Sequence, residues 1–136
     1  MLKKSLLENL SELKKVVCVD DEAEMIDLVK FILSRQDFIV TGAPDGKTGL
    51  KTIEEVQPDL VILDLMMPEI DGWEVYQQMQ AREDMVDIPV IILTAKAQSI
   101  DRVLGLHIAR VNAYLTKPFK PQDLLETIDR VLTKAG

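Results

Sequence analysis

Short apolar runs alternate with longer amphipathic segments along this chain. The apolar runs fall near residues 15–20, 37–41, 59–64, 89–94 and 113–116. Between or after them, apolar residues recur at helical spacing near residues 23–34, 46–56, 72–82, 98–108 and 121–134. Strands that are almost wholly apolar are typical of parallel sheets covered on both faces. The pattern therefore predicts an α/β protein in which five strands alternate with helices.

The way in which such strands are joined restricts their order in the sheet. Crossover connections between parallel strands are nearly always right-handed, which leaves few topologies. We expect a doubly wound five-stranded parallel sheet of order 2-1-3-4-5, with helices on both faces in a three-layer sandwich. In this order the first and third strands lie side by side at the switch point, where ligands bind beyond the carboxyl ends of the strands.

The first twelve residues lie outside this plan. Leu2, Leu6, Leu10 and Leu13 recur at spacings of four, four and three residues, which is consistent with a short amphipathic helix. The tendency of termini to be loosely ordered favours a tail whose leucines rest on the domain, and a helix used for docking or self-association is the alternative. We therefore divide the chain into an N-terminal extension at residues 1–12 and one domain at residues 13–136, with no second domain.

Composition narrows the class of protein. A chain of 136 residues with 47% hydrophobic content suits one folded domain, and its formal net charge of −7 argues against nonspecific binding to DNA or to an anionic membrane. The single cysteine, Cys18, excludes an internal disulfide and fits a reducing compartment. No apolar run approaches the roughly 18 residues that span a bilayer, and no signal peptide opens the chain. We expect a cytoplasmic protein.

Groups suited to metal or phosphate chemistry end four of the apolar runs. Asp20 and Asp21 end the first, Asp64 the third, Thr94 the fourth and Lys117 the fifth. In a parallel sheet these ends meet at one edge. Three carboxylates at one place repel one another unless a cation compensates them, and Mg²⁺ prefers oxygen ligands. Capping of the next helix or a surface position could explain any one residue, but not the whole set.

The segments VVCVDDE, DLVILDLMMPEIDG, VIILTA and YLTKPF together resemble the receiver domain of bacterial two-component response regulators. The resemblance covers about residues 14–134 and implies the flavodoxin-like 2-1-3-4-5 fold. By position, it implies that Asp64 accepts a phosphoryl group, that Thr94 and Lys117 contact that group, and that Tyr114 acts with Thr94 as a switch. It also implies a Mg²⁺ site, or a Mn²⁺ site, formed by Asp20, Asp21, Asp64 and the backbone carbonyl of Met66.

The resemblance implies a single-domain response regulator. A sensor histidine kinase or a histidine phosphotransfer protein would supply the phosphoryl group from a phosphohistidine. The face formed by residues 98–108, 113–116 and 121–134 would then change and bind a downstream protein. Such a protein catalyses only its own phosphorylation and dephosphorylation, so we do not expect an enzyme that acts on other substrates.

Two segments depart from the family pattern. Residues 109–114 read Ala-Arg-Val-Asn-Ala-Tyr, without the usual glycine and with one extra residue. Glu126 and Thr127 stand where receivers that dimerise to bind DNA usually carry arginine. Together with the negative net charge, which also argues against membrane binding, Glu126 and Thr127 lead us to expect no direct DNA binding and no membrane binding. The oligomeric state stays open.

Three other functions fit parts of the pattern. An aspartyl-phosphate hydrolase needs a second acid two residues after its nucleophile, where this chain has Met66. A flavin or nucleotide carrier needs hydrogen-bond donors after the first strand, where Asp20, Asp21 and Glu22 would repel phosphate. A receiver-like interaction module that works without phosphorylation remains the main alternative, although such a chain should have lost at least one site residue.

Overall fold

The computed structural model describes residues 13–95 and 112–135 of the chain. Its strands are β1 (Lys14–Val19), β2 (Phe38–Ala43), β3 (Leu60–Asp64), β4 (Val90–Thr94) and β5 (Ala113–Thr116). Its helices are α2 (Ala23–Leu33), α3 (Gly46–Val56), α4 (Gly72–Gln80) and α6 (Pro121–Ala135). The amphipathic segment at residues 1–12 and the helix expected near residues 98–108 lie outside the described residues.

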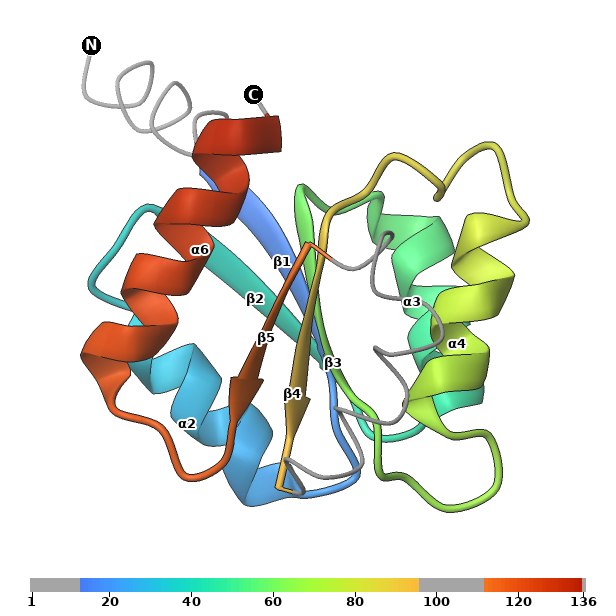
Figure 1. Cartoon of the computed structure of the whole chain (residues 1–136), viewed down its shortest axis with the longest axis horizontal. Coiled ribbons are helices and arrows are strands. Elements are labelled where there is room, and N and C mark those ends of the chain that lie inside the picture. Colours follow the sequence, from blue (N-terminus) through green and yellow to red (C-terminus); the bar gives the residue numbers. More distant parts are fainter. Residues whose placement is uncertain (1–12, 96–111, 136) are drawn as a thin grey trace, which may run out of the picture.

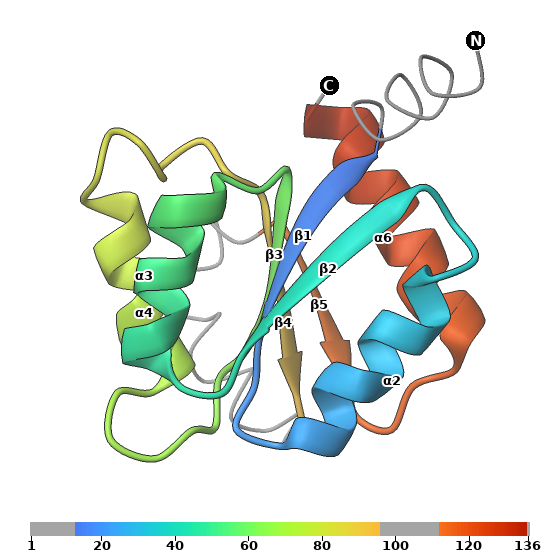
Figure 2. The ribbon, with the colours of Figure 1, turned by 180° about the vertical axis from the view of Figure 1, so that it is seen from behind.

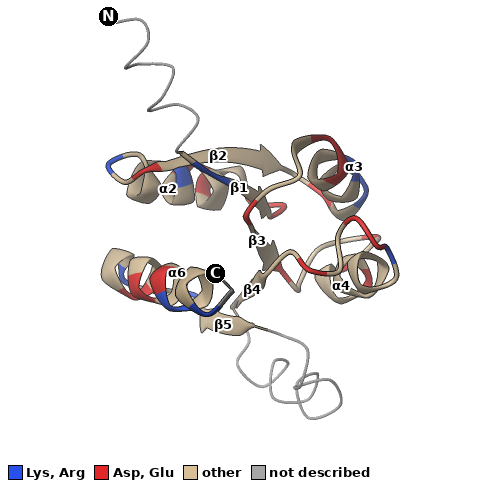
Figure 3. Cartoon of the chain, turned by 90° about the horizontal axis from the view of Figure 1, so that it is seen from above, with Lys and Arg blue, Asp and Glu red and all other residues tan. Residues whose placement is uncertain are grey.

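The five strands form one parallel sheet of order β2-β1-β3-β4-β5, which confirms the predicted topology. Helices α2 and α6 cover one face and α3 and α4 cover the other, as two opposite views of the ribbon show (Figure 1, Figure 2). The view from above separates the same three layers (Figure 3). None of the helices within the described residues is long and apolar enough to cross a lipid bilayer.

Alternation along the central strands builds two cores. On β1, Val17 and Val19 belong to the core beneath α3 and α4, whereas Val16 and Cys18 belong to the core beneath α2 and α6. All four side chains are fully buried. Each buried aliphatic side chain of this size stabilises the fold by about 1.5–3 kcal/mol before entropy is counted. Burial on both faces explains why these strands are almost wholly apolar.

Strand β2 runs two residues further than the sequence predicts, to Ala43 instead of residue 41. Thr41, Gly42 and Ala43 continue the pairing with β1, although glycine there reads as the start of a turn. A Cβ atom on Gly42 would clash with the Cγ2 methyl group of Ile26. It would also lie only 3.3 Å from the Cδ1 atom of the same side chain. Glycine is therefore needed for the close packing of α2 on β2.

The helices begin where capping residues allow. Asp71 accepts a hydrogen bond from the backbone N–H of Glu74 at 2.8 Å, so the predicted N-cap of α4 is confirmed. Such a cap stabilises a helix by about 1 kcal/mol. In α6, the Thr127 hydroxyl donates to the Asp123 carbonyl at 2.7 Å and the side chain is buried. Thr127 is therefore not available as a surface position, unlike the exposed Glu126 beside it.

Candidate functional site

The predicted carboxylates meet at the carboxyl ends of β1 and β3. Asp20 directly follows β1, Asp64 is the last residue of β3, and the two strands pair side by side. Asp20 is fully buried and Asp64 is only 3% exposed, whereas Asp21 and Glu22 are exposed. One carboxylate oxygen from each of these four residues lies within 4.8 Å of the others. The parallel sheet thus brings Asp64 next to the consecutive residues Asp20, Asp21 and Glu22, although Asp64 lies 44 positions after Asp20 in the sequence.

Lys117 extends into this cluster from the end of β5. Its Nζ donates to Asp20 Oδ2 at 2.8 Å, to Glu22 Oε1 at 3.1 Å and to Asp64 Oδ2 at 3.5 Å. The lysine side chain is 8% exposed. The peptide bond between Lys117 and Pro118 is cis. The ammonium is thus almost removed from water and is surrounded by carboxylate oxygens.

Backbone donors orient the two buried carboxylates. The N–H of Met66 donates to Asp64 Oδ1 at 3.1 Å, and the N–H of Glu22 donates to Asp20 Oδ1 at 2.9 Å. In each carboxylate the other oxygen, Oδ2, faces Lys117. The side chains are therefore held in a fixed direction before any ligand binds, and preorganisation of this kind lowers the cost of binding and catalysis.

Gly72 supports the loop that follows Asp64. Its N–H donates to the carbonyl of Leu65 at 3.1 Å. A Cβ atom at this position would lie 2.7 Å from the carbonyl carbon of Asp64 and 2.8 Å from the Cα of Leu65, and both are backbone atoms that cannot rotate away. Trp73, the next residue, is half-buried against the core beneath α3 and α4, directly after the Gly72 N–H that bonds Leu65.

Burial and charge shift the ionisation of the site. Burial raises the pKa of Asp64 to about 6, and the negative charge of Asp20 acts in the same direction, while the Met66 N–H and Lys117 oppose the shift. Burial alone would lower the pKa of Lys117, but its hydrogen bonds to Asp20 and Glu22 and the charge of Asp64 leave that pKa above its ordinary value. Lys117 is therefore cationic, and burial disfavours the ionised form of Asp64.

The remaining predicted residues lie around the cluster. Thr94 is the last residue of β4, the strand that pairs with β3. Met66 follows Asp64 by two positions and is 45% exposed. Tyr114 lies on β5 with an exposed side chain, outside the cluster. Cys18 is buried beneath the site. Burial raises the pKa of its thiol to about 12, and the negative charge of Asp20 adds to this shift. Cys18 is therefore an inert core residue.

Sequence analysis missed Glu22 as a member of the site. We considered it only as part of an acidic run that repels phosphate. Its side chain in fact contacts Lys117, 95 residues away in sequence. The available signal was an acidic residue directly after an aspartate pair at the start of a helix, but that position equally suggests helix capping.

The donor set of the cluster fits a divalent cation. The cluster holds four carboxylates, and three of them contact the one ammonium, so the cluster is anionic. Carboxylate and carbonyl oxygens are the ligands that Mg²⁺ prefers, and it keeps several waters as well. A cation here would also offset the negative charge of Asp20, which adds to the effect of burial in raising the pKa of Asp64. Asp20, Asp21 and Asp64, three of the predicted metal ligands, therefore lie close enough together to share one cation.

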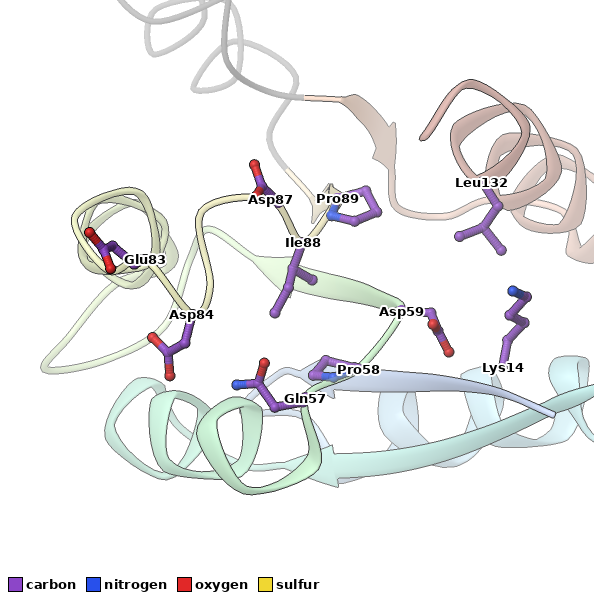
Figure 4. Close-up of a pocket in the computed structure, with 10 residues that line it drawn as sticks. All are labelled: Lys14, Gln57, Pro58, Asp59, Glu83, Asp84, Asp87, Ile88, Pro89 and Leu132. Atoms are coloured by element: carbon purple, nitrogen blue, oxygen red, sulfur yellow. The ribbon is translucent and has the colours of Figure 1, made fainter. Parts of the chain in front are cut away.

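A separate hollow of about 450 Å³ lies at the opposite edge of the sheet, at the amino ends of β1 and β3 (Figure 4). Several of its polar groups already have partners: Asp59 accepts from the N–H of Lys15 at 2.7 Å, and Asp84 pairs with Arg82 at 3.0 Å. None of the predicted site residues lines it. This hollow is therefore not part of the site that the sequence predicts.

Comparison with known sequences gives a family match. The family model described as the response regulator receiver domain matches residues 16–129. Over 122 residues the chain is 38% identical to the alkaline phosphatase synthesis transcriptional regulatory protein PhoP of Bacillus subtilis. That match covers 90% of this chain but 50% of PhoP, so the chain spans about half the length of this relative.

Solved structures agree with the sequence match. A CheY-like response regulator receiver domain protein from Methanospirillum hungatei superposes with a TM-score of 0.81 at 30% identity, over 91% of this chain and 97% of that chain. The receiver domain of a sensor histidine kinase from Pseudomonas aeruginosa superposes with a TM-score of 0.80 at 28% identity, over 89% and 98% of the two chains. That structure has a magnesium ion coordinated in its active-site cleft.

Proposed function

Because the chain belongs to the response regulator receiver domain family, we propose that it accepts a phosphoryl group from a phosphohistidine on Asp64 in a Mg²⁺-dependent reaction. The observation that carries this proposal is the environment of Asp64. Its carboxylate is buried, oriented by a backbone N–H, and placed beside both an ammonium group and three other carboxylates. The donor protein is a sensor histidine kinase or a histidine phosphotransfer protein.

In the proposed reaction, a carboxylate oxygen of Asp64 attacks the phosphorus. The bond from phosphorus to the histidine nitrogen breaks, the new acyl phosphate forms on Asp64, and the leaving imidazole keeps the electron pair and takes a proton from water. Lys117, whose Nζ already lies 3.5 Å from Asp64 Oδ2, donates to a phosphoryl oxygen. Mg²⁺ held by Asp20, Asp21, Asp64 and the Met66 carbonyl, or Mn²⁺ in its place, would offset negative charge on the other phosphoryl oxygens.

The ionisation of Asp64 suits this role. Attack requires the carboxylate, and a pKa of about 6 leaves Asp64 mostly ionised at neutral pH even before a cation binds. Lys117 keeps its charge under the same conditions because its pKa lies above the ordinary value. Positioning and charge neutralisation are then the main contributions of the protein, as in other phosphoryl transfers.

We further propose that Thr94 and Tyr114 relay phosphorylation to a binding surface. The acyl phosphate gives Thr94, at the end of β4, a new hydrogen-bond acceptor. Tyr114 lies on the neighbouring strand β5 and is exposed in this state. A shift of both side chains would alter the face of residues 98–108, β5 and α6, and a downstream protein would read that change.

The unit that carries this function is proposed to be residues 13–136, with residues 1–12 as an extension. Net charge and the reduced, buried Cys18 support a cytoplasmic protein that binds other proteins and not DNA. On this proposal the protein modifies only its own aspartate and is not an enzyme for separate substrates. PhoP is by name a transcriptional regulator, but it is about twice the length of the matched region.

Titration of Mg²⁺ and then beryllofluoride, a phosphoryl mimic, tests the proposal through the fluorescence of Trp73, the only tryptophan. The wild type should respond to each ligand in turn. Asp64→Asn should lose the beryllofluoride response, whereas Asp59→Asn, at the other end of β3, should keep it. The alternative function, an interaction module that works without phosphorylation, predicts no saturable response to beryllofluoride in the wild type.

A further inference from the structure

Glu22 occupies the N-cap position of α2 but does not cap the helix with its side chain. Asp45 and Asp71, at the N-caps of α3 and α4, do accept hydrogen bonds from their own helices. The Glu22 carboxylate instead accepts a hydrogen bond from Lys117 Nζ at 3.1 Å. Helix capping therefore does not explain this side chain, and its contact with the site needs another explanation.

Lys117 has three N–H donors and three carboxylate partners. Two of these partners, Asp20 and Asp64, are buried. The Glu22 side chain is 62% exposed, so its contact is the one most screened by water and the easiest to break. A lysine whose donors are all engaged has none left for a phosphoryl oxygen.

We propose that Glu22 is a positioning residue that holds Lys117 in the unphosphorylated protein and competes with the phosphoryl group for it. This inference rests on the proposed phosphorylation of Asp64. When the phosphoryl group arrives, Lys117 turns one donor from Glu22 to a phosphoryl oxygen and keeps its 2.8 Å contact with Asp20. Glu22 thereby lowers the affinity of the site for phosphoryl groups while it keeps the ammonium near Asp64 in the resting state.

The exposure of the contact between Glu22 and Lys117 sets the expected change in the affinity for a phosphoryl mimic. Exposed ion pairs contribute little, so loss of the contact should tighten binding of a phosphoryl mimic by about two- to fivefold. Two substitutions separate geometry from charge. Glu22→Gln removes the negative charge, whereas Glu22→Asp keeps it on a side chain one methylene shorter. The matched control is Glu24→Gln, an acid in the first turn of the same helix with no contact to Lys117 in the part of the chain that the structure describes.

The experiment measures the apparent Kd of beryllofluoride at saturating Mg²⁺ through Trp73 fluorescence. Both Glu22 variants should bind about two- to fivefold more tightly than the wild type, and Glu24→Gln should not differ. If Glu22→Asp binds beryllofluoride like the wild type, and Glu22→Gln and Glu24→Gln change the affinity equally, then Glu22 acts only through its negative charge. Weaker binding in both Glu22 variants would show that Glu22 assists the phosphoryl group, and either result overturns the proposal.

Two further readouts distinguish other causes. Mg²⁺ affinity is measured separately, because the Glu22 carboxylate lies in the same cluster as the proposed metal ligands. If Glu22→Gln loses as much Mg²⁺ affinity as Asp21→Asn does, Glu22 is a metal ligand and the positioning role is overturned. In metal-free protein, the NMR signal of the Lys117 ammonium should shift in the Glu22 variants and not in Glu24→Gln. This signal tests the contact even if the wild type binds no beryllofluoride, a result that would reject the proposed phosphorylation instead.

Discussion

Asp64→Asn should make the metal-free protein more stable at neutral pH, although it removes the proposed phosphoacceptor. Asp64 is buried, and its pKa rises from 3.8 to about 6 in the folded protein. Each pKa unit corresponds to about 1.4 kcal/mol, so ionisation of Asp64 costs the folded state about 3 kcal/mol. Asparagine has nearly the same shape and no charge, and it avoids this cost.

The pH window follows from the direction of the shift. Below about pH 3 Asp64 is protonated in both states and contributes no difference, because its unfolded pKa is 3.8. As pH rises from 3.8 to about 6, the unfolded chain releases the proton and the folded chain keeps it, so the stability of the wild type falls relative to the variant. Above that window the difference is constant. The variant should therefore gain about 3 kcal/mol on the wild type between pH 3 and pH 7.5.

Urea unfolding in a metal chelator at several pH values measures this difference directly. Asp45→Asn is a control of opposite sign, because the N–H of Thr48 donates to the Asp45 carboxylate and lowers its pKa. The stabilisation by Asp45 is present above its unfolded pKa and is lost as pH falls. Saturating Mg²⁺ should narrow the gap between Asp64→Asn and the wild type, because a ligand that binds only the folded state stabilises it. A gap that stays flat from pH 3 to pH 7.5 would refute the reasoning.

Three other outcomes are expected. Gly72→Ala should lower the free energy of unfolding, measured in urea, by about 1–3 kcal/mol, and it should also slow phosphorylation of the protein. The reason is that the added Cβ would lie 2.7 Å from the carbonyl carbon of Asp64. Wild-type stability together with a wild-type phosphorylation rate would contradict this prediction. Met66→Asn should shorten the acyl-phosphate lifetime severalfold, roughly 1 kcal/mol of barrier, because an amide beside Asp64 can orient the attacking water; an equal lifetime counts against it. Amide hydrogen exchange should change most across residues 95–120 on activation with beryllofluoride, and a change centred on α2 or α3 would reject the proposed output face.

The sequence was sufficient where local pattern and topology agree. The alternation of apolar runs and helical segments led to the order 2-1-3-4-5, because handedness leaves few alternatives. Convergence of Asp20, Asp64 and Lys117 followed from that order, since the ends of parallel strands share an edge. Asp71 at the start of α4 was readable from local chemistry alone.

What the sequence did not reveal depends on contacts between distant segments. Gly42 reads as a turn residue, and only the packing of Ile26 against it explains why β2 continues. Glu22 reads as part of an acidic run that repels phosphate, and only the position of Lys117 shows where its carboxylate lies. The pKa of Asp64 depends on burial and on neighbours in space, which no local pattern contains.

Intact-mass measurement after incubation with acetyl phosphate tests the central claim most directly. The wild type with Mg²⁺ should gain one phosphoryl group. It should gain none when the metal is chelated, and Asp64→Asn should gain none under either condition. Labelling that persists in Asp64→Asn, or that does not depend on a divalent cation, would contradict the assignment of Asp64 as the phosphoacceptor of a Mg²⁺-dependent receiver.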